Sequence, residues 1–345
     1  MNVTHPATVV YPAWASTCAF VWCCCCILAG VLGNTVTILS VVHDTKLRLS
    51  STAKFVVSLC CTDLLFCTVC LPVTASRYAQ HAWTLGTALC QLFPLVFYWN
   101  VAASLFNMCA LTVNRLVLVV WHAKYKSIYT NLSITLMIVF CWLLPVLLLL
   151  APTFEIWGRF GYVQRTFSCT ILHDTNGQSP KKFFFLLGFF LPCVVIVASY
   201  GAIFRKVRSS QKSVEHYGSC RRRDGSRSKE ERAMTRAMLA IFCTFLVCYL
   251  PLMVANVLDN DDQWPALHVL ASALAWTASA TNPFIYCLLS TRYRRAFINL
   301  FTRVQSSPAV RGHLRSSSVF LEYLNARERT GGRPMNVTIT ELDNE

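Results

Sequence analysis

The amino-acid sequence predicts an all-α membrane protein whose seven helices cross the bilayer as a bundle. Of the 345 residues, 55% are hydrophobic and only 14% are charged, whereas about 25% of the residues in a soluble domain are charged. The runs show no alternation over about ten residues, which excludes a transmembrane β-barrel. Seven runs with almost no charge reach the ~20 residues that a membrane-spanning helix needs: residues 12–42, 55–75, 90–113, 131–153, 183–204, 237–258 and 263–291.

The 31 Lys and Arg residues predict how the bundle is oriented. Between the second and third runs and between the fourth and fifth there are few of them, namely Arg77, Arg159, Arg165, Lys181 and Lys182. All others lie in the alternate loops and in the tail. Cytoplasmic loops carry the excess of positive charge, so we expect residues 1–14 outside, a membrane domain over residues 15–302, and a disordered cytoplasmic tail over residues 303–345. The net charge of +15 then reflects the membrane topology and also attracts the chain to anionic membrane lipids. It does not indicate nucleic-acid binding.

Most of the 18 cysteines lie inside the apolar runs, where a thiol behaves as a small hydrophobic group. Cys90 and Cys169 lie on the predicted outer side, where a disulfide can form and persist. We expect these two to be joined, with Cys18 as a competing partner. Asn2 begins the glycosylation sequon Asn-Val-Thr on the same side.

Two ionisable residues inside the runs point to function. Arg115 follows more than twenty uncharged residues, and a guanidinium there faces water or a partner; the alternative is an arginine that snorkels to the interface. Asp63 is the one carboxylate inside any run. It is either a structural polar group or part of a small hydrated cation site, for which the available partners are Asn34, Ser104, Ser279 and Asn282.

Prolines and charges near the cytoplasmic ends indicate moving parts. Most runs contain proline within or at the end of the helix, which kinks a helix and supplies hinges. Glu231 is placed near the start of the sixth run, where it can pair with Arg115 as a switch element. After the seventh run, residues 291–302 place Tyr293 and Phe297 on one helical face, which predicts a short amphipathic helix on the inner membrane surface.

One set of residues, spread over all seven runs, forms a recognisable pattern: Gly33, Asn34, Asp63, Trp83, Cys90, Arg115, Trp142, Pro192, Tyr200, Phe245, Pro251 and the run Asn282-Pro283-Phe284-Ile285-Tyr286. With this pattern the chain resembles the rhodopsin-like (class A) G-protein-coupled receptors over residues 15–302. The finer resemblance, over residues 248–259, over the run ALAWTASATNPFIY and at Tyr125, is to the branch that holds the Moody and trapped-in-endoderm receptors and a medium-chain fatty-acid receptor.

The resemblance implies a receptor of the plasma membrane that is not an enzyme. Its partners would be a heterotrimeric G protein, with a tilt toward inhibitory Gα, and then arrestin and receptor kinases. The G-protein switch would consist of Asn114, Arg115, Tyr200, Glu231, Asn282, Pro283 and Tyr286. No organic cofactor is expected, and a sodium ion beside Asp63, Ser104 and Asn282 is the one metal that the family implies.

Three positions depart from the family pattern. Asn114 replaces the aspartate that usually precedes the arginine, so Arg115 loses one restraint and we expect raised basal activity. Tyr249 replaces the usual tryptophan beneath the ligand. Ala278 stands where many sodium-binding relatives have asparagine, which weakens the sodium prediction.

The family's ligand pocket, carried over to this sequence, is aromatic and mostly apolar. An aminergic ligand would lack a counter-ion because Phe97 replaces the amine-binding aspartate, and an unpaired buried charge is costly. The seventh run contains no lysine, which excludes a retinal Schiff base. A hydrophobic or lipid-like small molecule is therefore expected, with Arg77, Arg159, Arg165 and His173 as rim groups for a carboxylate or phosphate. The pocket residues are Val73, Phe97, Tyr98, Val101, Phe184, Gly188, Tyr249, Leu252, Met253, Asn256, Ser272 and Trp276.

Two alternatives use other ligands or another mechanism. A small peptide could bind the same fold, although the short amino terminus and apolar pocket favour it less. A membrane transporter would need inverted repeats with interrupted helices, and the sequence shows no such repeat.

Overall fold

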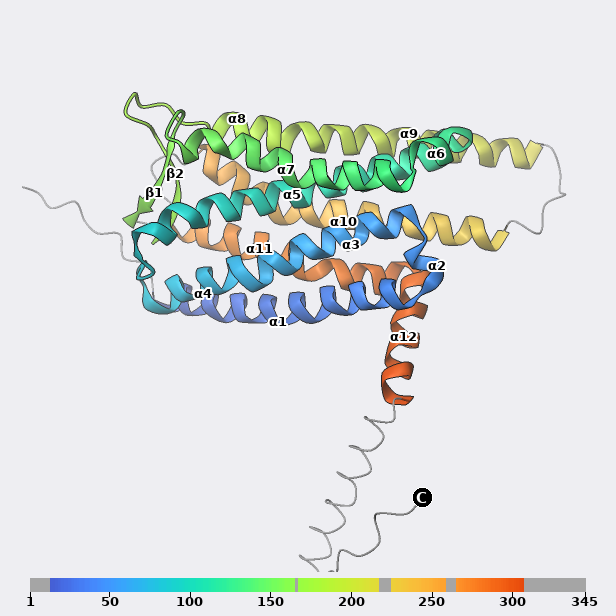
Figure 1. The fold of residues 1–345 in the computed structure, drawn as a ribbon, viewed down its shortest axis with the longest axis horizontal. Coiled ribbons are helices and arrows are strands. Elements are labelled where there is room, and N and C mark those ends of the chain that lie inside the picture. Colours follow the sequence, from blue (N-terminus) through green and yellow to red (C-terminus); the bar gives the residue numbers. More distant parts are fainter. Residues whose placement is uncertain (1–12, 165–166, 217–224, 259–264, 307–345) are drawn as a thin grey trace, which may run out of the picture. The chain divides into compact units, whose positions relative to one another are not determined.

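The computed structural model describes residues 13–164, 167–216, 225–258 and 265–306 (Figure 1). The chain divides into two compact units, with the boundary after Phe297. The first unit is a bundle of long helices that run side by side. Its helices are α1 (Ala13–His43), α3 (Ser51–Leu65) continued by η1 (Phe66–Cys70) and α4 (Leu71–Gln80), α5 (Gly86–Val120), α7 (Asn131–Thr153), α8 (Lys181–Phe185) continued by η3 (Leu186–Phe190) and α9 (Leu191–His216), α10 (Gly225–Leu258) and α11 (Pro265–Leu289).

Shorter elements mark the two ends of this bundle. At one end, β1 (Arg159–Val163) and β2 (Ser168–Leu172) form an antiparallel hairpin, with Tyr162 opposite Cys169; this is the hairpin end. At the other end lie the short helices α2 (Thr45–Arg48) and α6 (His122–Ile128); this is the α6 end. Strands were not expected in this otherwise helical fold, and the hairpin is an addition to it.

The last helix, α12 (Thr291–Ser306), confirms that a helix follows the seventh run, and it extends four residues beyond the expected end at residue 302. Tyr293, Ala296 and Phe297 are buried. Their spacing of three and four residues places them on one face of the helix.

The predicted membrane runs correspond to these helices. Among the described residues, six helical segments are long and apolar enough to cross a membrane. The predicted seventh span is α11, which has 25 residues and carries the polar residues Ser279 and Asn282, which lower its hydropathy. Both polar residues are buried inside the bundle, so they do not meet lipid.

The bundle exposes apolar side chains on its outside, and its apolar core also buries a number of polar residues. On α7 one exposed face is formed by Leu132, Leu136, Phe140, Leu143 and Leu147. Such a continuous apolar face is a surface for lipid. By contrast, the buried polar residues include Arg115 and also Asn34, Asp63, Asn107 and Asn114, and these last four form hydrogen bonds within the bundle.

Two prolines follow turns of π-helix. Pro72 is the second residue after η1, and Pro192 is the second residue after η3. A proline cannot donate the hydrogen bond to the residue four positions before it, and its ring collides with that carbonyl. Widening the preceding turn removes the collision, so both helices continue across the proline. The hinge positions expected from proline are therefore built into the second and fifth spans as π turns.

Helix α1 is held close to α11, with the ring of Pro283 lying against the backbone at Gly33. Asn34 donates from Nδ2 to the carbonyl oxygens of Gly30 and Ser279, both at 2.9 Å. A Cβ atom on Gly33 would lie 2.8 Å from Cγ of Pro283. Glycine at position 33 therefore allows the contact, and a larger side chain would force the two helices apart.

Replacing this glycine should destabilise the bundle. We expect Gly33→Val to lower the thermal unfolding midpoint of the purified protein by several degrees, because overpacking a close contact costs about 1–3 kcal/mol. The matched control is Gly201→Val, also in a helix, where an added Cβ meets nothing within 4 Å. Equal unfolding midpoints for the two variants would contradict the close α1–α11 contact.

Candidate functional site

Two adjoining cavities lie inside the bundle near the hairpin end. The first, of about 100 Å³, lies between α4, α5, α10, α11 and β2. The second, of about 90 Å³, lies between α5, α7 and the segment α8–η3. Tyr98, Val101, Lys181 and Met253 line both, so these residues lie between the two cavities.

Most of the expected pocket residues line these cavities. Trp276 does not: it is 1% exposed and packs edge-on against Tyr78, with the ring centroids 5.8 Å apart. Val73 also lies outside both linings, and the side chain of Asn256 falls outside the described residues. The first cavity is lined by Phe97, Tyr98, Val101, Tyr249, Leu252, Met253 and Ser272, and the second by Tyr98, Val101, Phe184, Gly188 and Met253.

The structure also revises which basic residues reach the pocket. Arg77, expected at the rim, lines the first cavity. Arg159 and His173 line neither cavity, and Arg165 is outside the described residues. Lys181 and His268 line the first cavity but were not among the expected pocket residues.

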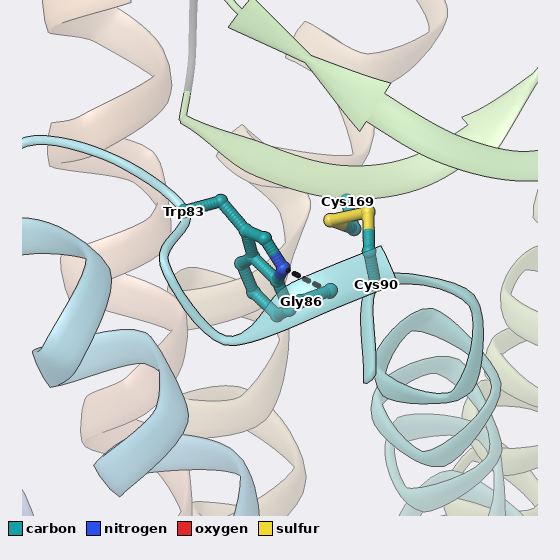
Figure 2. The surroundings of a disulfide bond; sticks show 4 residues. All are labelled: Trp83, Gly86, Cys90 and Cys169. Carbon is teal, nitrogen blue, oxygen red and sulfur yellow. Dashed lines mark hydrogen bonds between the residues drawn. A yellow bond between two sulfur atoms is a disulfide. The ribbon is translucent and has the colours of Figure 1, made fainter. Parts of the chain in front are cut away.

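A disulfide ties the hairpin to the bundle directly above the first cavity. Cys90, near the start of α5, is bonded to Cys169 of β2, with the Cα atoms 5.3 Å apart (Figure 2). This confirms the predicted pair, and Cys18 is free. Beside the bond, the Trp83 indole donates to the Gly86 carbonyl at 2.8 Å. Gly86 has a φ of +81°, a backbone conformation that glycine adopts without strain.

The hairpin also contributes to the wall of the cavities. The hydroxyl groups of Tyr98 and Thr170 lie 2.7 Å apart and share a hydrogen bond. Phe160 and Ile171 are buried and pack with Leu149 of α7. The hairpin is therefore part of the pocket wall. The disulfide fixes the hairpin to α5.

The middle of the bundle holds the expected polar cluster. Asp63 is 2% exposed and accepts a hydrogen bond of 2.7 Å from Nδ2 of Asn282. Both residues line a cavity of about 10 Å³ together with Ser104 and Ser279. Ser104 donates to the Thr62 hydroxyl at 2.8 Å. Three of the four expected partners of Asp63 thus surround this cavity, whereas Asn34 bonds to α1 and α11 backbone instead.

Tyr249 connects this polar cluster with the pocket. Among the described residues it alone lines both the first cavity and the cavity of Asp63. Its ring stacks on Phe245, with the centroids 4.4 Å apart, and Phe245 also faces the Asp63 cavity. A ligand that displaces Tyr249 would therefore change the surroundings of Asp63.

At the α6 end, Asn114 and Arg115 are buried near the end of α5. Asn114 accepts a hydrogen bond from the Thr52 hydroxyl at 2.9 Å and donates to the Tyr125 hydroxyl at 3.1 Å. Tyr125 stacks on Tyr129 at 4.9 Å between centroids. Asn114 thus holds α3 and α6 in place, and both ends of its amide are used.

Arg115 faces a cavity of about 780 Å³. The phenol groups of Tyr125, Tyr293 and Tyr200 and the carboxylate of Glu231 lie within its electrostatic reach. Arg115 and Glu231 both line this cavity, and the neighbouring Glu230 pairs with Arg295 at 3.4 Å. The ion pair between Arg115 and Glu231 stays a prediction.

The remaining switch residues lie between the polar cluster and this cavity. Tyr286 is fully buried and its ring stacks on Tyr293, with the centroids 5.0 Å apart. Pro283, after Asn282 in α11, contacts the glycine face of α1. Tyr200 lies beside Thr112 and Arg115. The expected switch residues therefore occupy one half of the bundle, from its centre to the α6 end.

Comparison with known proteins supports a common family. A family model described as 7 transmembrane receptor (rhodopsin family) matches residues 33–286. Protein trapped in endoderm-1 of Drosophila melanogaster is 41% identical over 327 residues, covering 87% of this chain and 82% of that protein. The G-protein coupled receptor moody of the same species is 30% identical over 328 residues, which cover 78% of this chain but only 49% of moody. The predicted resemblance to these two is confirmed.

Among solved structures, squid rhodopsin superposes with a TM-score of 0.75. The alignment covers 88% of this chain and 91% of that structure, at 22% sequence identity. A likeness at this level of identity shows the fold, and it confirms the predicted seven-helix bundle.

The disulfide should act as a single stabilising unit. We expect Cys90→Ser, Cys169→Ser and the double variant to lower the thermal unfolding midpoint by the same several degrees, since either change removes the same bond. Cys18→Ser, at an exposed free cysteine, is the control and should leave the midpoint unchanged. Additive effects of the two single changes would show that each cysteine acts independently of the bond.

Proposed function

The chain belongs to the rhodopsin family of seven-transmembrane receptors, and we propose that it couples a hydrophobic or lipid-like ligand to a heterotrimeric G protein of the inhibitory class. The ligand would bind the two cavities at the hairpin end, and the G protein would bind at the α6 end. The protein is a multi-pass membrane receptor rather than an enzyme. Arrestin and receptor kinases are proposed as further partners at the α6 end.

We place this receptor in the plasma membrane with the hairpin end outside. Two observations support this orientation. The Cys90–Cys169 bond lies at the hairpin end, and disulfides persist in oxidising compartments. Lys46, Lys124 and Lys126 lie in or beside the short helices of the α6 end, as expected for the cytoplasmic side. The sequon at Asn2, proposed for glycosylation, lies outside the described residues.

The observation that carries the proposal is the position of Tyr249 between the pocket and Asp63. A receptor needs a group that a ligand can touch and that also contacts the interior switch. Tyr249 lines both cavities on α10, the same helix that carries Glu231 at its other end. Movement of this ring would therefore be transmitted along α10 to the cavity that faces Arg115.

The pocket supports a hydrophobic ligand. Aromatic and aliphatic side chains form most of the lining, including Phe97, Leu252 and Phe184. No carboxylate occurs among the described residues that line either cavity. A ligand amine would therefore be buried without a counter-ion, which is costly.

The cavity at the α6 end supports G-protein binding. Its volume of about 780 Å³ would admit a turn of a helix, such as the end of a Gα subunit, with Arg115 at its base. The ligand acts only through its different affinity for two states of the receptor. In the active state α10 would move outward, and Tyr200 and Tyr286 would turn toward Arg115.

Nucleotide exchange tests the proposed function. Membranes that hold the receptor with purified inhibitory Gα and βγ should accelerate exchange of a GTP analogue when a lipid-like agonist is added. Arg115→Ala should lose this acceleration while reaching the cell surface in equal amounts. Exchange that is unaffected by Arg115→Ala would contradict the proposed role of the cavity.

Basal activity should depend on Asn114. Because Asn114 bonds to Thr52 and Tyr125 and carries no charge, it restrains Arg115 less than a carboxylate would. We expect Asn114→Asp to lower agonist-free exchange severalfold, since a carboxylate would attract the adjacent guanidinium. The readout is exchange by membranes with matched receptor content.

The matched control is Asn131→Asp, the same change at the α6 end, where Asn131 accepts a hydrogen bond from Lys54 at 2.6 Å. This control should leave basal exchange unchanged. An equal fall in agonist-free exchange in both variants would show that the effect comes from surface charge and not from the attraction to Arg115.

We further propose that a sodium ion occupies the cavity beside Asp63. Oxygen donors suit hard cations, and Asp63, Ser104 and Asn282 present them around one cavity. The volume of about 10 Å³ is close to that of one water-sized sphere, which suits a single ion. Ala278, in the same lining, adds no oxygen, so we expect weak binding.

Sodium should then stabilise the receptor selectively. We expect the thermal unfolding midpoint to rise in NaCl relative to KCl at equal ionic strength, because an ion that binds only the folded state stabilises it. Asp63→Asn should abolish the difference between the salts. Equal midpoints in the two salts for the unaltered protein would rule out the site.

A further inference from the structure

We propose that the hydroxyl group of Tyr293 binds the guanidinium of Arg115 while the cavity at the α6 end is empty, and that a G protein must break this contact to bind. The inference rests on the proposed function and adds a restraint that was not expected from the sequence. Tyr293 belongs to α12, which follows the last helix of the bundle. It would position Arg115, and Arg115 itself would face the partner.

Two polar atoms in the wall of this cavity lack a hydrogen-bond partner. Among the buried side-chain nitrogen and oxygen atoms of its described lining, these two are Nε of Arg115 and the hydroxyl oxygen of Tyr293. Arg115 is 5% exposed and Tyr293 is 1% exposed. A buried polar group without a partner is costly, so one bond between these two residues would remove a cost on each side.

The two groups are chemically complementary. A guanidinium carries N–H donors and no acceptor, whereas a phenol oxygen accepts hydrogen bonds. A hydrogen bond from a charged donor is stronger than a neutral one. Tyr293 lies within electrostatic reach of Arg115 and lines the same cavity. Rotation about the bonds of the long arginine side chain is therefore the movement that would join them.

The packing of the Tyr293 ring fixes the position of its hydroxyl. The ring stacks on Tyr286, with the centroids 5.0 Å apart and an angle of 22° between the planes, and it meets Phe297 edge-on at 6.5 Å. Tyr286 is fully buried in α11. An acceptor that is already fixed loses little freedom when a hydrogen bond forms, which favours the bond.

The other tyrosine hydroxyls near Arg115 are less suited to this role. The hydroxyl of Tyr125 already accepts a hydrogen bond from Asn114 at 3.1 Å. Tyr200 and Tyr286 are not among the described residues that line the cavity. Tyr293 is therefore the tyrosine that combines a place in the cavity wall with an unused hydroxyl.

Glu231 is a second acceptor in the cavity wall, but it stands on a different helix. It belongs to α10, whereas Tyr293 belongs to α12. In the proposed active state α10 moves outward and carries Glu231 with it. Tyr293 would stay in place, so its restraint on Arg115 would last until the G protein arrives.

The contact belongs to the receptor without a partner. In the proposed function a helix of the Gα subunit fills the cavity of about 780 Å³ and covers Arg115. The partner and the Tyr293 hydroxyl then compete for the same guanidinium. Removing the hydroxyl should therefore shift the receptor toward the state that binds the G protein.

Tyr293→Phe tests the hydroxyl alone, because it keeps the stacked ring. We expect agonist-free exchange of a GTP analogue to rise about threefold or more, since a hydrogen bond to a charged group is lost from the resting state only. Membranes with matched receptor content give the readout. The matched control is Tyr162→Phe, at an exposed tyrosine of β1 outside the described linings of the two pocket cavities, and it should leave exchange unchanged.

A second background separates the hydrogen bond from packing. In Asn114→Asp the new carboxylate attracts the guanidinium, so Tyr293→Phe should change agonist-free exchange by less than about twofold there, as coupled residues do in a double-mutant cycle. If Tyr293 served only to pack α12, its replacement would act equally in both backgrounds. An equal fold-change in the two backgrounds, or no rise at all in a receptor that does couple, would overturn the proposal.

The contact itself can be measured without a G protein. The purified full chain in nanodiscs, labelled with an NMR-active carbon at Cζ of tyrosine, gives a Tyr293 signal that is assigned by its loss in Tyr293→Phe. This signal should shift in Arg115→Ala and in Asn114→Asp, while the Tyr162 signal stays constant. A Tyr293 signal that is unchanged in both variants would overturn the proposal. The expected shifts without nucleotide exchange by any variant would support the contact and count against the proposed function instead.

Discussion

The hydrogen bond from Asn282 to Asp63 is the interaction on which the rest of the bundle depends. It is 2.7 Å long and buried, and it joins the second span to the seventh. In lipid, polar groups must find their partners inside the protein. On the pocket side of this bond, Tyr249 lines both the first cavity and the cavity of Asp63. On the other side, Tyr286 stacks on Tyr293, which lines the cavity of Arg115.

Asn114 fixes two helices to each other at the α6 end of the bundle. Its amide joins α3 to α6 through Thr52 and Tyr125, so it serves the scaffold rather than the adjacent arginine. Arg115 and Glu231 line the same wide cavity, at the end of the bundle where we propose that the G protein binds.

Much of this fold could be predicted from sequence because lipid imposes a simple rule on composition. Long uncharged runs had to be helices, and Cys90 and Cys169 were the cysteines placed for a bond outside the membrane. The rotation of each helix was not predictable, because it follows from packing. Trp276 therefore turned out to pack on Tyr78 instead of lining the pocket, and His268 and Lys181 lined it unexpectedly. The β-hairpin was missed because its five-residue strands leave little pattern.

In the proposed function, α10 moves relative to α6 when a G protein occupies the wide cavity. The most direct measurement is the distance between nitroxide labels at Lys126 of α6 and Arg236 of α10, both exposed, by pulsed electron resonance. Binding of nucleotide-free G protein should lengthen this distance, while a label pair at Lys126 and Leu136 of α7 stays constant. An unchanged distance in receptor that demonstrably holds the G protein would contradict the claim.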